Sequence, residues 1–424
     1  MKRREFIKCS ALGFGAISLF SPNVFASSHG GHSSKRIVVI GGGYGGMTAA
    51  RYAKMIDPKM EVILVEKNPQ FVSCPISNWV IGGMKKMDDI TFGYQGLSAR
   101  GIKVVRDEIL GIDAKAGFVE GKLGKIEYDR LIVSPGIGFR YEGIDGFDAN
   151  AQKSFLHAYK AGPQTLQLRQ ELVAMKPGGT VLMRVPDGFY RCPPGPYERA
   201  SLIANYLKKN KKGSKLIILD PHKDIASKGK LFHQAWDAYY SDIIDFRTEE
   251  VIAAVDSGRK TVSTYEEEFK PDVVNFIPDQ KAGALAFALG LVPKGKYWAP
   301  VNPVTFESTL VPNVHVIGDA TDPKTSGPMP KSGFVANSMG KVAAAAAIAQ
   351  LNGKKPAMPS LANTCYSMVN EDEAIFVTGV YKHDPASGEN IKIAEASKTS
   401  PGRSKLYGRH AEDWATSIWS DMLS

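Results

Sequence analysis

Three cysteines could carry redox chemistry in this chain, since a thiolate attacks disulfides and a pair of thiols holds two electrons. They are Cys74, Cys192 and Cys365; a fourth, Cys9, lies within residues 1–26, which have the pattern of an export signal. An odd number is unexpected in an exported protein, because disulfides use cysteines in pairs. Counting alone leaves two equal interpretations: a structural disulfide with one buried thiol, or a reactive set.

The local sequence favours a reactive role for Cys192. It lies in YRCPPGPYER, residues 190–199, where prolines would hold the sulfur in a fixed geometry for attack by an incoming anion. Glu198, at the expected start of a helix, is the nearest candidate for moving protons, and could equally be a carboxylate stabilised by the helix dipole. Cys74 lies in FVSCPISNWVIGG and Cys365 in ANTCYSMV, so Cys192 and Cys365 can meet only through the tertiary fold.

A glycine-rich loop predicts a dinucleotide site near the start of the processed chain. An apolar strand over residues 37–40 is followed at once by Gly41, Gly43 and Gly46, and then by a helix. Glycines at this spacing let the backbone approach a pyrophosphate, and the amides at the helix N-terminus bind its negative charge. The alternative is a tight turn that binds nothing.

The next strand supports the dinucleotide interpretation. It covers residues 62–65 and ends at Glu66, whose carboxylate would accept hydrogen bonds from ribose hydroxyls. Lys67 follows directly, and we assign it to the same cofactor site. Strand, glycines, helix, strand and terminal acid in this order are far more specific than a glycine pattern alone.

Two later segments indicate that the dinucleotide is FAD. YDRLIVSPGI, residues 128–137, is a strand that runs into Gly136, and VPNVHVIGDATD, residues 311–322, is a strand that ends at Gly318 and Asp319. With the first glycine loop, they resemble the three nucleotide signatures of flavoproteins that have two dinucleotide domains. The resemblance implies that Asp319 binds the ribityl chain or the pyrophosphate of FAD.

An Ala-rich helix is expected after this segment. Its first turn contains Lys331, Ser332 and Gly333. Such a helix start would favour the negative charge that develops on the flavin pyrimidine ring during reduction. We therefore place these three residues in the flavin site.

The middle of the chain has the pattern of a second dinucleotide domain with a lost nicotinamide site. Residues 180–185 and the segment KLIILD, which ends at Asp220, are expected strands joined through a helix. The connection after the first strand has no Gly-x-Gly-x-x-Gly and is crowded by prolines. Each proline removes a backbone donor and stiffens the loop, which does not suit a pyrophosphate. Electrons should therefore enter by a route other than NAD(P)H.

These stretches, with GDAT, MPKSGFVANSMGK and NTCYSMV, resemble the flavin-binding subunit of flavocytochrome c sulfide dehydrogenase, a relative of the sulfide:quinone oxidoreductases. The resemblance covers nearly all of the processed chain. It implies that Cys74 is bonded covalently to the 8-methyl group of FAD and that Cys192 and Cys365 form a redox-active disulfide. Hydrosulfide or a polysulfide would attack this disulfide and leave as sulfur or polysulfide. Electrons would pass through FAD to a separate c-type cytochrome subunit.

The acceptor and the main alternatives follow from what the sequence lacks. There is no Cys-x-x-Cys-His, so the chain has no c-type haem of its own. Residues 381–424 show no sustained amphipathic helix, which favours a cytochrome over a membrane quinone and predicts no integral membrane segment. The alternatives are a sulfide:quinone oxidoreductase, an NAD(P)H-dependent disulfide reductase, and a flavoprotein with structural cysteines that aids thiosulfate oxidation.

The predicted fold class is α/β, with two Rossmann-like dinucleotide-binding domains of the flavin disulfide reductase type and a C-terminal α+β domain. The predicted parts are a signal peptide (1–26), the first part of the FAD domain (35–150), the second Rossmann-like domain (151–280), the second part of the FAD domain (281–350) and a flavin-facing interface domain (351–424).

The net charge and the N-terminal signal limit which partners and which cellular compartment are expected. The net charge is +10, and removing residues 1–26 leaves roughly +7, with basic residues scattered rather than gathered among aromatic ones. Nucleic acid is therefore not expected as a partner, and no metal site is predicted. Arg3 and Arg4 open a twin-arginine-like signal, which predicts export of the folded protein to the periplasm.

Overall fold

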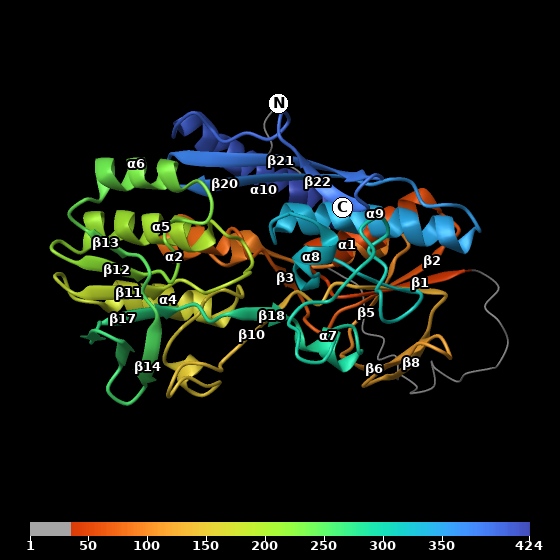
Figure 1. Cartoon of the computed structure of the whole chain (residues 1–424), viewed down its shortest axis with the longest axis horizontal. Coiled ribbons are helices and arrows are strands. Elements are labelled where there is room, and N and C mark those ends of the chain that lie inside the picture. The colour runs from red at the N-terminus through yellow and green to blue at the C-terminus, as the bar shows by residue number, and fades with distance from the viewer. Residues whose placement is uncertain (1–34) are drawn as a thin grey trace, which may run out of the picture. The chain divides into compact units, whose positions relative to one another are not determined.

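The computed structural model describes residues 35–424, coloured from red to blue along the chain in Figure 1. The predicted export signal and Cys9 lie outside these residues. The described residues lie within one compact unit. The domain boundaries expected within that unit therefore stay predictions.

The first parallel sheet is assembled from two distant parts of the chain. Its five strands have the order β19-β9-β1-β2-β5 and all pair in parallel. The central strands are continuous apolar runs, which suits a sheet buried on both faces. The strands are β1 (Arg36–Ile40), β2 (Glu61–Val65), β5 (Lys103–Val105), β9 (Arg130–Val133) and β19 (Val314–Val316), with helices α1 (Tyr44–Ile56) and α9 (Gly333–Leu351).

The second parallel sheet confirms the second Rossmann-like unit. Its order is β13-β12-β11-β17, and the chain returns between strands through helices. It has its own hydrophobic core, separate from that of the first sheet. Its elements are β11 (Thr180–Arg184), β12 (Lys215–Leu219), β13 (Ile244–Arg247) and β17 (Val273–Phe276), with α4 (Pro163–Ala174), α5 (Gly195–Asn210) and α6 (Gly229–Tyr239).

A C-terminal antiparallel sheet and one long helix complete the fold. They are β20 (Ser360–Met368), β21 (Ala374–Asp384), β22 (Glu389–Ile393) and α10 (Lys405–Leu423). Strand β20 packs against both α9 and α5, so it touches the helices of both parallel sheets (Figure 1). This placement brings a C-terminal strand to the junction of the two sheets, as the predicted fold class requires.

The remaining elements are short. They are β3 (Phe71–Val72), α2 (Ser77–Gly82), η1 (Asp88–Ile90), β4 (Thr91–Phe92), α3 (Gln95–Ala99), β6 (Ile109–Asp113), β7 (Phe118–Gly121), β8 (Gly124–Glu127), β10 (Ile137–Phe139), η2 (Ala151–Lys153), β14 (Ile252–Asp256), β15 (Thr261–Thr264), β16 (Glu268–Phe269), β18 (Gln280–Ala282), α7 (Ala284–Ala288), η3 (Gly318–Ala320) and α8 (Pro323–Ser326). Of these, α2 and η3 adjoin the candidate site.

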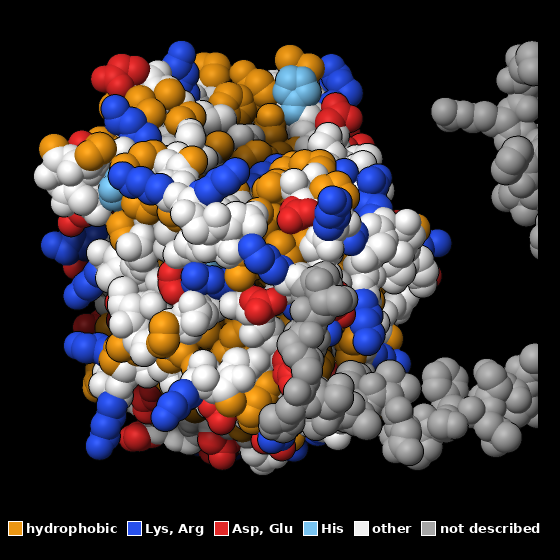
Figure 2. All heavy atoms as spheres, turned by 90° about the vertical axis from the view of Figure 1, so that its right-hand side faces the viewer, with side chains coloured by type: hydrophobic (Ala, Val, Ile, Leu, Met, Phe, Trp, Pro, Cys, Tyr) orange, Lys and Arg blue, Asp and Glu red, His pale blue; other side chains and the backbone are white. Residues whose placement is uncertain are grey.

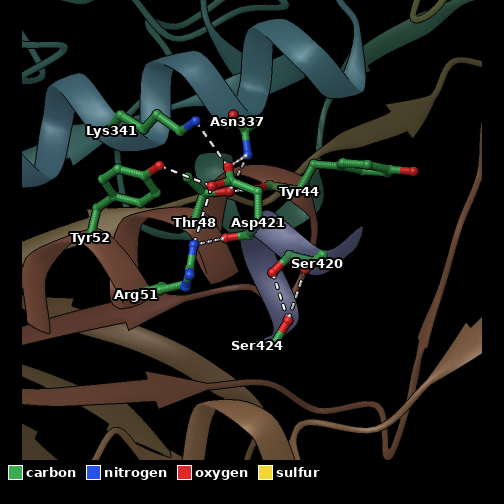
Figure 3. Close-up of polar contacts among 9 residues, drawn as sticks. All are labelled: Tyr44, Thr48, Arg51, Tyr52, Asn337, Lys341, Ser420, Asp421 and Ser424. Carbon is green, nitrogen blue, oxygen red and sulfur yellow. Dashed lines mark hydrogen bonds and ion pairs between the residues drawn. The ribbon is translucent and has the colours of Figure 1, made fainter. Parts of the chain in front are cut away.

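The carboxylate of Asp421 links helix α10 to both α1 and α9 (Figure 3). It accepts hydrogen bonds from Tyr52 at 2.9 Å and Asn337 at 2.8 Å, and forms ion pairs with Arg51 at 3.2 Å and Lys341 at 2.9 Å. Burial favours the neutral acid, but the hydrogen bonds from Asn337, Lys341 and Tyr52 outweigh it and lower the pKa of Asp421. The end of the chain is thereby fixed on the first parallel sheet's helices.

Helix α9 is the one helix among the described residues that is long and apolar enough to cross a membrane, and 56% of its most apolar window is buried. It packs directly on α1: a Cβ at Gly340 would lie 2.5 Å from the backbone oxygen of Gly45. Such backbone-to-backbone packing identifies α9 as an interior helix of this fold.

The surface shows no single basic band on the face seen in Figure 2. Lys and Arg side chains there are interspersed with hydrophobic and acidic ones. A band of basic side chains along one face is the usual footprint of a nucleic-acid-binding protein. The expectation that nucleic acid is not a partner stays a prediction.

Candidate active site

The three glycines of the first loop have different structural duties. Gly41 has φ +102°, and a Cβ there would lie 2.3 Å from Ser134 O; a Cβ at Gly46 would lie 1.8 Å from Gly41 O. These two positions close the turn and admit no side chain. Gly43, the N-cap residue of α1, has nothing within 4 Å of its Cβ position. The open space lies at a helix N-terminus, where a pyrophosphate would be stabilised.

Glu66 and Lys67 differ in how close they lie to this loop. Glu66 accepts a hydrogen bond from the Gly42 amide at 2.6 Å and another from the Asn68 amide at 2.8 Å. Its carboxylate therefore stands beside the glycine loop. Lys67 is exposed and ion-pairs with Glu108 at 3.2 Å. Its side chain therefore lies at the protein surface and, among the described residues, makes no polar contact with the glycine loop.

Asp319 offers a buried acceptor that fits FAD. It follows Gly318, which has φ +74°, at the end of β19, and its Oδ1 is buried with no hydrogen-bond partner among the described residues. Burial raises the pKa of Asp319, and the positive charges of Arg191 and Lys331 oppose that rise. A buried carboxyl oxygen without a donor is costly. A ribityl hydroxyl would supply one, so the residues present fit the group. Gly136, with φ +64°, has open space at its Cβ position.

The start of α9 supports the Asp319 loop. Ser332 is the N-cap residue and Gly333 the first helical residue. Lys331 is buried and its Nζ donates to the backbone oxygen of Asp319 at 2.8 Å. Burial lowers the pKa of Lys331 to about 7, against the opposing charge of Asp319. Lys331 therefore stabilises the loop that contains Asp319, a role that the sequence did not indicate.

The structure brings Cys192 and Cys365 together. Both are half-buried free thiols, like Cys74, and each is the largest influence on the pKa of the other: their interaction raises the pKa of Cys192 and lowers that of Cys365. Cys192 has φ +54°, a strained conformation for a residue with a Cβ, and its amide donates to Lys331 O at 2.6 Å. A Cβ at Gly195 would lie 3.0 Å from Cys192 Sγ. The sulfur is thus seated over the first residue of α5, next to the start of α9.

Cys74 lies apart from this pair but close to it through Arg191. Its Sγ is 3.2 Å from Tyr159 O and 3.1 Å from Arg191 Nη2. Arg191 also donates to Tyr159 O and directly precedes Cys192 in the chain. The structure thus groups Cys74 with Arg191, and Cys192 with Cys365; the roles that the resemblance implies for the three cysteines stay predictions. Arg191 was missed from the sequence, although its place beside Cys192 was a usable signal.

Glu198, on α5, contacts two other segments of the chain, α2 and β20. Its carboxylate accepts hydrogen bonds from Asn78 Nδ2 at 3.1 Å, Trp79 Nε1 at 3.1 Å and the Met368 amide at 3.0 Å. Burial raises the pKa of Glu198, and these three donors partly offset the rise. The contacts give it a structural duty, and the raised pKa suits a group that holds a proton. Its role as the proton-transfer group stays a prediction.

Two backbone amides of the proline-rich loop already donate hydrogen bonds to other parts of the protein, so they are not free to bind a nicotinamide dinucleotide. The Cys192 amide donates to Lys331 O, and the Arg191 amide donates to Gln280 Oε1 at 2.8 Å. Asp220, at the end of β12, is fully buried and accepts a hydrogen bond from the Tyr197 hydroxyl at 2.7 Å. In dinucleotide folds an acid at this place binds the ribose. These contacts support the expected loss of the nicotinamide site.

Two alanine substitutions separate the glycine that leaves room for a cofactor from the one that only closes the turn. Gly43→Ala adds a methyl group in open space, so we expect unchanged apoprotein stability and flavin binding weakened about tenfold, roughly 1.4 kcal/mol. Gly46→Ala collides with backbone and should lower the free energy of unfolding by about 1–3 kcal/mol. Flavin titration and urea unfolding of both apoproteins measure this, with each substitution and the reference protein made in a Cys74→Ser background so that flavin binding stays reversible. Equal flavin affinity in Gly43→Ala and the wild type would contradict the assignment.

Three family models match this chain. The central domain of the sulfide dehydrogenase [flavocytochrome c] flavoprotein chain matches residues 165–278, and the flavin-binding domain of flavocytochrome c sulphide dehydrogenase matches residues 357–423. The pyridine nucleotide-disulphide oxidoreductase model matches residues 35–174. The matches thus include the segments that carry Cys74, Cys192 and Cys365, and they show flavin binding.

Relatives and solved structures agree with the family models. The sulfide dehydrogenase [flavocytochrome c] flavoprotein chain of Chlorobaculum thiosulfatiphilum is 51% identical over 47 residues, 98% of that sequence and 11% of this chain. The mitochondrial sulfide:quinone oxidoreductase of Dictyostelium discoideum is 22% identical over 328 residues, 72% of this chain and 70% of that one. The Aquifex aeolicus sulfide:quinone oxidoreductase structure has TM-score 0.73 at 20% identity, covering 92% of each chain. The chain therefore belongs to the flavocytochrome c sulfide dehydrogenase flavoprotein family, FAD-dependent oxidoreductases built on the pyridine nucleotide-disulphide oxidoreductase fold.

Proposed function

We propose that this protein oxidises hydrosulfide to sulfur or polysulfide through a redox-active pair, Cys192 and Cys365, next to FAD. The observation that carries the proposal is the contact between these two thiols. They come from distant parts of the sequence and meet beside the start of α9. The family membership supports the substrate, because sulfide is named in its members.

The chemistry balances as thiol–disulfide exchange. In the oxidised enzyme, HS⁻ forms a bond to one sulfur of the disulfide, the S–S bond breaks, and the other cysteine leaves as a thiolate. A second HS⁻ then removes the outer sulfur as HSS⁻, which leaves a dithiol. FAD, when bound, supplies the two-electron acceptor that returns this dithiol to the disulfide. Two hydrosulfide ions thus lose two electrons.

The chain's own residues position this chemistry. The strained backbone of Cys192 and its amide bond to Lys331 fix the direction of one sulfur. Gly43 and Asp319 would hold the pyrophosphate and ribityl parts of FAD. Glu198, buried and with a raised pKa, would hold a proton near the pair.

Single substitutions Cys192→Ser and Cys365→Ser should fold and keep flavin, yet lose sulfide-driven flavin bleaching by several orders of magnitude, because the covalent route is gone. Anaerobic stopped-flow absorbance at the flavin band measures this. A purely structural disulfide predicts the reverse: stability lower by about 2–5 kcal/mol and activity per folded molecule retained. Activity in both variants would sink the mechanism.

We further propose that Cys74 is the covalent attachment point of FAD. It is the cysteine left out of the pair, it is half-buried, and Arg191 Nη2 lies 3.1 Å from its sulfur. Arg191 donates a hydrogen bond to this sulfur, which would help to hold it in a fixed direction. The attachment also accounts for an odd number of cysteines after removal of the signal.

Acid denaturation should therefore leave FAD on the wild-type polypeptide, because unfolding does not break a thioether. Cys74→Ser should release free flavin, while Cys365→Ser, the matched control, should retain it. Intact-protein mass spectrometry reads the adduct directly. A wild-type mass without FAD would rule out the attachment.

We propose a c-type cytochrome subunit as the electron acceptor, with sulfide:quinone oxidoreduction as the alternative that the relatives' names suggest. A monotopic quinone enzyme needs an apolar face free for the bilayer. The expectation of no sustained amphipathic helix in residues 381–424 is wrong, because α10 is one: its Ile418 and Met422 are buried, Trp419 packs on Phe92 at 4.7 Å, and Trp414 stacks on Phe334 at 6.4 Å. Its apolar side therefore faces the protein interior, apart from the exposed Leu406, which supports the soluble acceptor. Periplasmic location, by the twin-arginine route, stays a prediction.

Sulfide-reduced protein should be reoxidised by cytochrome c faster than by a soluble quinone, at a rate that changes with salt. A charge of roughly +7 on the processed chain would steer a charged partner, and salt screens exposed charges beyond about 8–10 Å. Stopped-flow reoxidation at low and high salt compares both acceptors. A quinone rate about tenfold higher at both salt concentrations would favour the alternative.

A further inference from the structure

Lys228 is a buried lysine whose side chain reaches the cysteine pair. It is 8% exposed, and its Nζ donates to Ser367 Oγ at 2.8 Å. The same Nζ lies 3.2 Å from Cys365 O and 3.8 Å from Cys365 Sγ. All three acceptors belong to β20, whereas Lys228 is the N-cap residue of α6. The ammonium group is thus held against the strand that carries one of the two sulfurs.

The backbone at Lys228 is adapted to this position. Its φ is +63°, a left-handed conformation that is uncommon for a residue with a Cβ, and its side chain does not cap its own helix. Strained residues of this kind persist where the surrounding structure holds them, and they cluster at active sites. The strained backbone of Lys228 accompanies the placement of its ammonium group against β20.

Lys228 has no carboxylate partner within ion-pair distance among the described residues. The Glu198 carboxylate interacts with Lys228 only at longer range. Its oxygens accept hydrogen bonds from Asn78, Trp79 and Met368 instead. A buried ammonium group without a nearby anion is costly. An anion that forms during the reaction would therefore be stabilised beside it.

The groups around the pair favour the thiolate on Cys365. A hydrogen bond from Cys192 and the charge of Lys228 lower the pKa of Cys365, against burial and the charge of Glu198. For Cys192, the interaction with Cys365, burial and the charge of Glu198 raise the pKa, and the charge of Lys228 opposes this rise without overcoming it. The two sulfurs are therefore chemically unequal, and Lys228 lies on the Cys365 side.

We propose that Lys228 decides which sulfur of the pair leaves: its ammonium group stabilises negative charge on Cys365, so that hydrosulfide adds to Cys192. This inference rests on the proposed function and deepens it. As HS⁻ forms its bond to Cys192 Sγ, the Cys192–Cys365 bond breaks and its electron pair stays on Cys365. The proton of HS⁻ remains on the persulfide, and the sulfide sulfur is oxidised as the disulfide is reduced.

The first test measures thiol reactivity without sulfide. Holoprotein reduced with dithiothreitol is pulsed with iodoacetamide from about pH 5 to 10, and peptide mass spectrometry quantifies label on each cysteine. In the wild type, Cys365 should be labelled at lower pH than Cys192. Lys228→Met should move the Cys365 midpoint up by about one pH unit or more, and Lys228→Arg should restore it. Lys230→Met, an exposed neighbour on the same helix, is the matched control and should behave as wild type.

The second test locates the added sulfur. One equivalent of sulfide is mixed anaerobically with oxidised holoprotein, quenched in acid and alkylated, and the extra sulfur should be found on Cys192. Should Lys228→Met fail to fold, Ser367→Ala removes the group that orients Nζ and should raise the Cys365 midpoint by a smaller amount. Flavin absorbance and melting temperature report folding of each variant.

Two results would overturn the role of Lys228: an unchanged Cys365 midpoint in folded Lys228→Met, or extra sulfur on Cys365. Loss of the proposed function would look different, because wild-type flavin would then not be bleached by sulfide. The alkylation profile does not depend on sulfide. The two failures are therefore distinguishable.

Discussion

The arrangement of this site depends on one buried carboxylate, that of Glu198. It belongs to α5, which follows Cys192; it accepts hydrogen bonds from α2, which follows Cys74, and from the Met368 amide on β20, which carries Cys365. Three cysteine-bearing segments that are distant in sequence are thereby joined at one side chain. A buried carboxylate demands donors, because an unsatisfied one would cost several kcal/mol. That demand fixes the segments relative to each other.

The second constraint is the seam between the two parallel sheets. Strand β20 packs on α9, beside the first sheet, and on α5, beside the second. Cys365 therefore lies on a strand that contacts helices of both sheets. The proline-rich loop reaches the same seam from the second sheet, and the Cys192 amide donates to Lys331 O just before α9. Two cysteines from distant parts of the chain thus meet where elements of both sheets come together.

Charge around the seam is distributed unevenly, and the unevenness has chemical consequences. Arg191 stands beside Cys74, and Lys228 stands beside Cys365. Cys192 has no cation in contact with its sulfur among the described residues, and burial disfavours its thiolate. A catalytic pair with one stabilised thiolate has a defined leaving group, whereas a symmetric pair would not.

What the sequence determined by itself is what local backbone chemistry requires. Gly41 and Gly46 admit no side chain, and the apolar run before them forms a buried strand; both features can be recognised from neighbouring residues. The prolines around Cys192 likewise predict a loop that does not suit a pyrophosphate. The sequence also identified Glu66 and Asp319 as acids at strand ends, and the structure places them beside the glycine loop and the start of α9. It placed Lys67 in the same site, yet the side chain pairs with Glu108 at the surface.

Which cysteines meet followed from resemblance, not from spacing. Tertiary structure alone decided the partners of Glu198, the cation beside each cysteine and the unpaired oxygen of Asp319. The reason is physical: a loop's shape depends on its own residues, but the pairing and charge of a buried group depend on every segment packed around it, and those segments are distant in sequence.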